Sequence, residues 1–284
     1  MPDTANGIVY HYCSLEAFKS IIENKCLWLC DIRKSNDSQE CIYFDQIMSE
    51  TIQQQIVNLQ DKAEPNSTDL VNLKKIKESI ETAQFEQIPI YVCSLSHDGD
   101  LLSQWRGYAD DGYGIALGFD SNLIHDKYNT LVAYCLCGDV FYGSKEEIAT
   151  QCVQCISDSI SIVQRLNISS ALFMVTASDI ILRRPFYKSN AFREENEFRI
   201  VLLRESPPQN DFYFQFSERK YRITNHQLSS YYEFSFASVK DNFLREIHLG
   251  PKCNIQPDDI RMFLKDCGYQ ADNIDIVPSQ ATYR

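Results

Sequence analysis

The order of strand-like and helix-like segments limits the fold of this chain more than any other feature of its sequence. Short apolar, β-branched runs predict strands at residues 8–10, 27–29, 90–94, 114–119, 132–142, 197–203, 212–216, 231–236, 246–249 and 274–277. Helical spacing of apolar residues occurs between them at residues 15–24, 41–85, 145–182 and 257–267. Strands and helices do not alternate one by one, so we predict an α+β fold with a split, largely antiparallel sheet.

Two of the helical blocks are long. Residues 41–86 are broken at Pro65 and predict a helical hairpin, which we interpret as an insertion or lid. Residues 145–182 predict a long helical segment that residues 167–170 can divide, and Ser14 is placed to cap the helix over 15–24. We treat residues 1–284 as a single α+β domain that carries the hairpin as an addition.

Composition excludes several classes of protein. The chain has 284 residues, of which 44% are hydrophobic and 12% aromatic, enough for a substantial core. No run reaches the roughly 18 apolar residues of a membrane helix, and the first residues lack the pattern of a secretion signal. The 11 cysteines therefore predict reduced, mostly buried thiols and a cytoplasmic location. The formal charge of −12 argues against a broad basic surface for nucleic acid.

A stripe of charge on one predicted strand is the strongest candidate for chemistry. Side chains of a strand alternate between its two faces, so Glu195, Glu197 and Arg199 are expected on one face and apolar residues on the other. The structural alternative is a solvated edge strand with cross-strand ion pairs. Against that alternative, two adjacent carboxylates repel each other unless a cation or ligand lies between them, and such groups gather at functional sites.

Other polar residues are weaker candidates. His11 ends the first predicted strand beside Tyr10, and an isolated histidine there is more often structural. Asn36, in the polar loop 35–40, either caps the next helix or faces a ligand. Ser94 ends a central strand, and Arg106 and Tyr108 offer a guanidinium for phosphate and a flat ring, although ordinary helix packing explains Tyr108 equally well.

Two common kinds of site are not predicted. Cys152 and Cys155 have zinc-like spacing but lack a second matched pair, and the five histidines are dispersed, so we predict no metal site. Neither a dinucleotide glycine fingerprint nor a Walker-type lysine is found.

Taken together, these segments resemble a known bacterial family. The similar elements are Tyr10–Ser14, Ser35–Asp37 with Glu40, Trp105–Ala109, Gly114–Phe119, Phe192 with the Glu195, Glu197 and Arg199 group, and Leu249–Pro251. In this order, over essentially the whole chain, they look like the domain of unknown function 2971. That resemblance implies a place in bacterial anti-phage defence or a toxin system, and it names no reaction.

A more distant resemblance implies a mechanism. Tyr10 and His11 followed by a short helix and strand are similar to the opening of DarT-type and diphtheria-toxin-type ADP-ribosyltransferases, and Glu195-Asn196-Glu197 matches their Glu-x-Glu pair. The resemblance implies the fold of those enzymes, NAD as substrate, and Glu197, Glu195 and His11 as catalytic residues. It also implies that Tyr10, His11, Asn36, Ser94, Arg106, Tyr108 and Arg199 bind the nucleotide.

Three hypotheses for function follow. The first is an ADP-ribosyltransferase or NAD glycohydrolase whose acceptor is a protein or a nucleic acid. The second is a metal-dependent nuclease that uses Asp37, Glu40 and the glutamate pair. The third is a non-enzymatic module that senses a nucleotide or binds a protein within a defence system.

Overall fold

The computed structural model describes residues 7–34, 40–61, 68–82, 89–128, 135–166, 180, 182–202, 215–224 and 226–283. The chain divides into two compact units. We call Met1–Ile32, Ile90–Asp139 and Glu194–Arg284 the sheet unit, and Arg33–Pro89 with Val140–Arg193 the helical unit.

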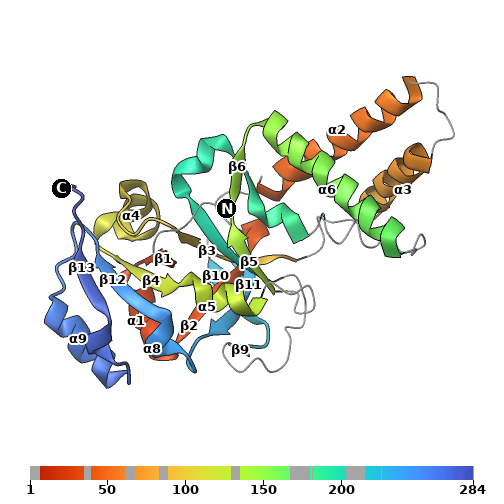
Figure 1. The fold of residues 1–284 in the computed structure, drawn as a ribbon. Coiled ribbons are helices and arrows are strands. Elements are labelled where there is room, and N and C mark those ends of the chain that lie inside the picture. Colours follow the sequence, from red (N-terminus) through yellow and green to blue (C-terminus); the bar gives the residue numbers. More distant parts are fainter. Residues whose placement is uncertain are drawn as a thin grey trace. The chain divides into compact units, whose positions relative to one another are not determined.

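The sheet unit is built on a single 11-stranded sheet (Figure 1). Its main path runs β10-β11-β2-β3-β1-β4-β12-β13, with β8 on β3, β5 on β8 and β9 on β11. The strands are β1 (Ile8–Cys13), β2 (Cys26–Asp31), β3 (Tyr91–Ser96), β4 (Ile115–Asp120), β5 (Cys135–Asp139), β8 (Glu197–Leu202), β9 (Gln215–Phe216), β10 (Lys220–Thr224), β11 (Gln227–Ser235), β12 (Leu244–Leu249) and β13 (Asp275–Pro278).

Pairing in this sheet is antiparallel except between β12 and β13, which are parallel. The sheet branches at β3. Along one edge, β3 pairs with β2 at Tyr91 and with β1 at Ser96. Its other edge pairs with β8 along its full length. The predicted α+β class and largely antiparallel sheet are therefore confirmed.

Short helices connect the strands of the sheet unit. They are α1 (Leu15–Asn24), α4 (Leu102–Tyr108), α5 (Ser121–Tyr128), α8 (Lys240–Phe243) and α9 (Pro257–Asp266), with 3₁₀ turns η3 (Asp110–Gly112) and η7 (Ala271–Asn273). The predicted cap of α1 is confirmed, because the Ser14 hydroxyl accepts a hydrogen bond from the Ala17 amide at 3.2 Å. Lys25 ends that helix in the left-handed conformation.

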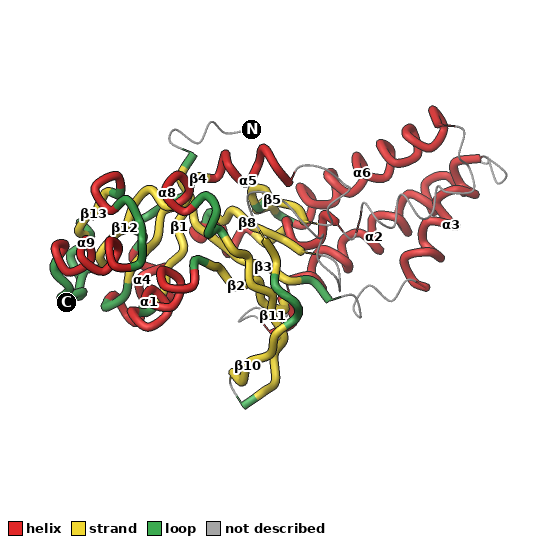
Figure 2. Tube along the Cα trace, turned by 90° about the horizontal axis from the view of Figure 1, so that it is seen from below, coloured by secondary structure: helices red, strands yellow, loops and turns green. Residues whose placement is uncertain are grey.

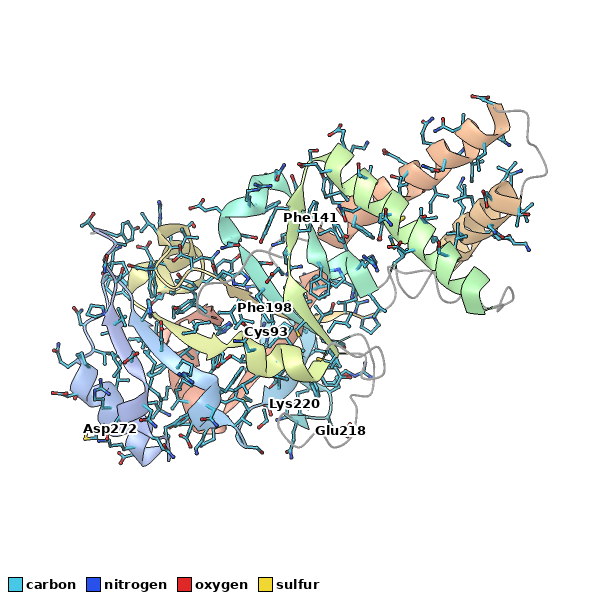
Figure 3. All side chains as sticks on the ribbon, in the orientation of Figure 1. Cys93, Phe141, Phe198, Glu218, Lys220 and Asp272 are labelled. Carbon is cyan, nitrogen blue, oxygen red and sulfur yellow. The ribbon has the colours of Figure 1, made fainter. Side chains whose placement is uncertain are left out.

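One face of the sheet carries the main hydrophobic core. Val9, Cys13, Leu95, Leu117 and Ile247 alternate along their strands with residues of the opposite face, and all belong to one buried cluster. Cys93 and Phe198, labelled in Figure 3, belong to the same cluster. We call this side of the sheet the core face.

The helical unit has a core of its own. Helices α2 (Glu40–Asp61), α3 (Thr68–Thr82) and α6 (Lys145–Leu166) pack together around residues such as Phe44, Leu73 and Cys152. Two short parallel strands accompany them, β6 (Phe141–Gly143) and β7 (Tyr187–Ser189). The 3₁₀ turns η1 (Ile32–Lys34), η5 (Arg184–Phe186) and η6 (Asn190–Glu195) complete the described elements. The hairpin predicted over 41–86 corresponds to α2 and α3.

Some elements differ from the sequence prediction. The interrupted strand over 132–142 becomes β5 and β6, which belong to different sheets, and β10 was not predicted. Figure 2 shows β10 and β11 as a hairpin, in which Tyr221 and Ile223 alternate with polar residues along β10 but are exposed rather than buried. The second half of the predicted helix over 145–182 lies largely outside the described residues.

No helix among the described residues combines the length and the apolar character needed to cross a membrane. Most of the 11 cysteines are buried, as predicted, and none forms a disulfide in the described part of the chain.

Candidate functional site

Strands β1, β3 and β8 present polar side chains on the side of the sheet opposite the core face. The register places Tyr10 opposite Ser96, Ser96 opposite Glu197, and Ser94 opposite Arg199. Residues directly opposite each other in an antiparallel pair project from the same face. We call this side, defined by Tyr10, Tyr12, Ser94, Ser96, Glu197 and Arg199, the polar face. Three segments distant in sequence therefore contribute to one surface of the sheet.

Glu197 and Arg199 form an ion pair within this face. The Nε and Nη2 atoms of Arg199 lie 2.6 and 2.5 Å from Oε2 of Glu197. Arg199 is 1% exposed and Glu197 is 8% exposed, because β8 lies between β3 and β5. The alternative of a solvated edge strand is therefore wrong. A buried guanidinium this close offsets the charge of the carboxylate, and neither group is easily lost without the other.

Glu195 does not belong to the strand. It ends the turn η6, and Asn196 follows with φ of 43°, in the left-handed region. The strand begins only at Glu197, so the regular alternation does not extend back to Glu195. The prediction that Glu195, Glu197 and Arg199 share one strand face is correct for the last two and wrong for Glu195.

The two serines of β3 occupy different environments. Ser96 is buried, and its hydroxyl donates to the Glu195 carbonyl oxygen at 3.0 Å while accepting from the Asp98 amide at 3.2 Å. Ser94 is exposed in the row beside Arg199. Of the two hydroxyls, that of Ser94 is available to a ligand.

His11 lies on the other side of β1. It alternates with Tyr10 and Tyr12 and shares the core face with Val9 and Cys13. Burial lowers the pKa of His11, and a hydrogen bond with the backbone of Ser94 opposes that shift. The resemblance implies His11 beside the glutamates as a catalytic, nucleotide-binding residue, and that arrangement is wrong, because His11 contacts β3 from the face opposite to Glu197.

Helix α4 packs on the polar face beside β1. Trp105 is fully buried, contacts the ring of Tyr12 edge-on, and donates from Nε1 to Asp100 at 2.8 Å. Arg106 and Tyr108 are exposed, and the guanidinium of Arg106 lies 5.6 Å from the centre of the Tyr283 ring. Asn36 and Asp37 lie outside the described residues, so their predicted roles stay predictions.

Two functional candidates on this face were missed from the sequence. Glu246 and His248 of β12 lie in the same two rows as Tyr10 and Tyr12, through Gly118 and Ala116 of β4. Oε2 of Glu246 accepts from the Tyr10 hydroxyl at 2.7 Å and lies 2.9 Å from Nε2 of His248. Burial and the hydrogen bond with Glu246 raise the pKa of Tyr10. The alternation of polar and apolar residues in Glu246-Ile247-His248 is the signal that could have revealed them.

Gly118 and Gly99 leave space for the contact between Tyr10 and Glu246. A Cβ atom at Gly118 would lie 2.9 Å from the Tyr10 ring and 3.0 Å from Cβ of Glu246, and one at Gly99 would lie 2.5 Å from the same ring. The Tyr10 ring therefore crosses β4 over a residue that has no side chain. Glycine is required there for close approach rather than for its backbone angles.

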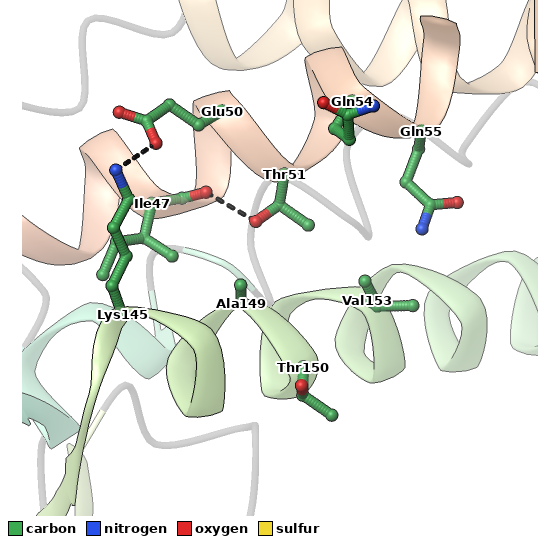
Figure 4. Close-up of a pocket in the computed structure, with 9 residues that line it drawn as sticks. All are labelled: Ile47, Glu50, Thr51, Gln54, Gln55, Lys145, Ala149, Thr150 and Val153. Carbon is green, nitrogen blue, oxygen red and sulfur yellow. Dashed lines mark hydrogen bonds and ion pairs between the residues drawn. The ribbon is translucent and has the colours of Figure 1, made fainter. Parts of the chain in front are cut away.

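A separate pocket lies in the helical unit between α2 and α6 (Figure 4). Lys145 Nζ lies 2.6 Å from Glu50 Oε2 at its edge, and Thr51 donates to the Ile47 carbonyl oxygen at 2.7 Å. Gln54, Gln55, Ala149, Thr150 and Val153 complete the lining. None of the predicted site residues lines it.

Metal ligands do not cluster in the part of the chain that the structure describes, where no three His, Cys, Asp or Glu side chains are grouped suitably. Cys152 and Cys155 are packed in the core of the helical unit. The burial of Cys152 raises its pKa to about 12, which keeps that thiol protonated.

Comparison with known proteins gives a match for part of the chain. Neither the curated proteins nor the solved structures contain a match, so the resemblance to ADP-ribosyltransferases stays a prediction. Residues 104–200 match the family model described as "Protein of unknown function (DUF2971)". This segment, about a third of the chain, runs from α4 to β8 and includes Arg106, Glu197 and Arg199, and it supports the resemblance to that family.

Proposed function

We propose that the polar face binds NAD and that the chain transfers ADP-ribose from it or hydrolyses it. The observation that carries the proposal is the strand register, which gathers Tyr10, Ser94, Ser96, Glu197 and Arg199 from three segments onto one face. Burial of Glu197 with Arg199 supports it, because charged side chains are seldom buried in protein interiors.

The chemistry needs a fixed negative charge. When the bond between nicotinamide and ribose C1′ breaks, its electron pair leaves with the nicotinamide nitrogen and positive charge develops at C1′. A carboxylate held nearby stabilises that charge. Glu197 takes this role, and Arg199 holds the carboxylate in one orientation through its two short contacts. A hydroxyl or amine of the acceptor, or water, then forms the new bond to C1′ and releases a proton.

Other residues take supporting roles in this proposal. The exposed hydroxyl of Ser94 is suited to a ribose hydroxyl, and the exposed guanidinium of Arg106 to phosphate. His11 lies on the core face and takes no part in this proposal. Glu195, which the turn at Asn196 separates from the strand, is the candidate for orienting the acceptor.

Release of nicotinamide from NAD tests the proposal. The wild-type chain is incubated with NAD alone, with single-stranded DNA, and with RNA, and free nicotinamide is measured by chromatography. Modification of the chain itself is followed with labelled NAD. We expect release in the wild type, and a loss of at least about 100-fold in Glu197→Gln, the scale seen when one transition-state contact is removed.

Two further variants guard against misfolding. Ser94→Ala changes an exposed hydroxyl without disturbing the core, and we expect it to raise KM for NAD. Glu218→Gln removes an exposed carboxylate near β10, labelled in Figure 3, and should leave release unchanged. Equal background release by wild type and Glu197→Gln under every condition would contradict the proposal. Tight NAD binding without release would instead support a nucleotide sensor.

A further inference from the structure

The turn between Glu195 and Glu197 has an uncommon backbone. Asn196 has φ of 43°, a region that residues other than glycine seldom occupy and that asparagine tolerates better than most. The side chain of Asn196 is exposed, so burial does not hold the residue in this conformation. Some other interaction must select the turn.

The end of β3 supplies that interaction. The Ser96 hydroxyl donates to the carbonyl oxygen of Glu195 at 3.0 Å, and the His97 amide donates to that of Asn196 at 2.9 Å. Ser96 is 2% exposed and lies directly opposite Glu197 in the ladder. Two consecutive carbonyl groups of the turn are therefore fixed by the last residue of β3 and the residue that follows it.

The Ser96 hydroxyl both donates and accepts a hydrogen bond. As it donates to Glu195, it accepts from the Asp98 amide at 3.2 Å, which ties the turn to the loop that leads to α4. The Ser103 hydroxyl of α4 adds a contact with Glu194 at 3.0 Å. The residues before β8 are thus held from both the end of β3 and the start of α4.

We propose that Ser96 is a positioning residue that sets how Glu197 is presented, by holding the left-handed turn at Asn196. The inference rests on the proposed function, in which Glu197 must lie at a fixed place beside ribose C1′. Without the Ser96 contact, the peptide between Glu195 and Asn196 loses the hydrogen bond to its carbonyl oxygen. Side chains of a strand alternate between its faces. A shift of one residue in the register of β8 would therefore move Glu197 to the other face.

Three variants distinguish the effect of the Asn196 backbone conformation from the effect of the Ser96 hydroxyl. Ser96→Ala removes the hydroxyl. Asn196→Val disfavours the left-handed conformation through its branched Cβ, whereas Asn196→Gly permits it. We expect kcat for nicotinamide release to fall about 10- to 100-fold in Ser96→Ala and Asn196→Val, with KM for NAD within about twofold, since a small misplacement costs the transition state more than the substrate. Asn196→Gly should retain most of the wild-type kcat.

Amide exchange of His97 gives a readout that needs no activity. We expect faster exchange of this amide in Ser96→Ala and Asn196→Val than in wild type and Asn196→Gly, with the β4 amides unchanged in all four. Equal His97 exchange in all four proteins would overturn the inference. So would faster exchange in the two variants with an unchanged kcat.

The two proposals fail separately. If the wild type releases no nicotinamide under any condition, the proposed function fails. The His97 exchange pattern then still decides whether Ser96 holds the turn at Asn196.

Discussion

Glu197 and Glu246 lie on the same face of one sheet, but their carboxylates contact different kinds of partner. Glu197, with 10% of its side chain exposed, is held by the permanent charge of Arg199. Glu246 is 20% exposed, and its partners are the Tyr10 hydroxyl and the His248 ring, neither of which must carry charge. The first arrangement pairs a carboxylate with a guanidinium, and the second holds a carboxylate by hydrogen bonds with a hydroxyl and an imidazole ring.

This difference suits the two carboxylates to different tasks. A carboxylate held by a buried arginine is fixed in orientation, which suits it to stabilise a developing positive charge. A carboxylate beside histidine and tyrosine can orient an acid or base. The proposed reaction therefore assigns the charge-stabilising role to Glu197, although Glu246 is the more exposed.

Removal of Arg199 should have the largest effect. Arg199→Met removes the cation beside the buried Glu197, and breaking such a pair costs about 3–5 kcal/mol of the free energy of unfolding. Urea unfolding of both proteins measures it. Arg106→Met, which removes an exposed cation, is the matched control and should change stability by less than about 0.5 kcal/mol. A loss below about 1 kcal/mol in Arg199→Met would mean that the pair is not buried as described.

A methyl group at Gly118 should disrupt the contact between Tyr10 and Glu246. Gly118→Ala introduces a Cβ atom against the Tyr10 ring and Glu246, and overpacking of this kind costs about 1–3 kcal/mol. Tyr10→Phe, which removes only the hydrogen bond to Glu246, should cost about 1 kcal/mol. In the double variant the two losses should not add, because both act on one contact. Gly107→Ala, where a Cβ atom meets nothing within 4 Å, is the control.

Changing the pH should have the smallest effect on stability. This series tests His11 on the core face rather than the residues of the polar face. Burial lowers the pKa of His11 below its usual value of about 6.5, so the unfolded chain binds a proton at a higher pH than the folded chain does. Stability from this residue is therefore complete above about pH 6.5 and is lost as the pH falls towards the folded pKa. His11→Gln should flatten the dependence of the urea midpoint on pH below 6.5. His226→Gln, at an exposed position, should leave it unchanged.

The sequence predicted the elements better than their assembly. Alternation identified β8 and its apolar face, and the cap at Ser14 marked the start of α1, because both signals are local. The same alternation suggested that Glu195 continues the strand, and it could not reveal the left-handed turn at Asn196, which the end of β3 holds. Glu246 and His248 were overlooked because their partner, Tyr10, is more than two hundred residues away in sequence.

By itself, the sequence determined the α+β class, the run of short strands, the helical hairpin and the charged pair on β8. These follow from patterns that a few neighbouring residues impose on the backbone. Only the tertiary structure decided that His11 faces the core, that Glu197 is buried with Arg199, and that Tyr10 reaches Glu246 across a glycine. The physical reason is that the side of a strand on which a residue lies, and what it meets there, depends on the register between strands. That register is set by contacts between segments far apart in the chain.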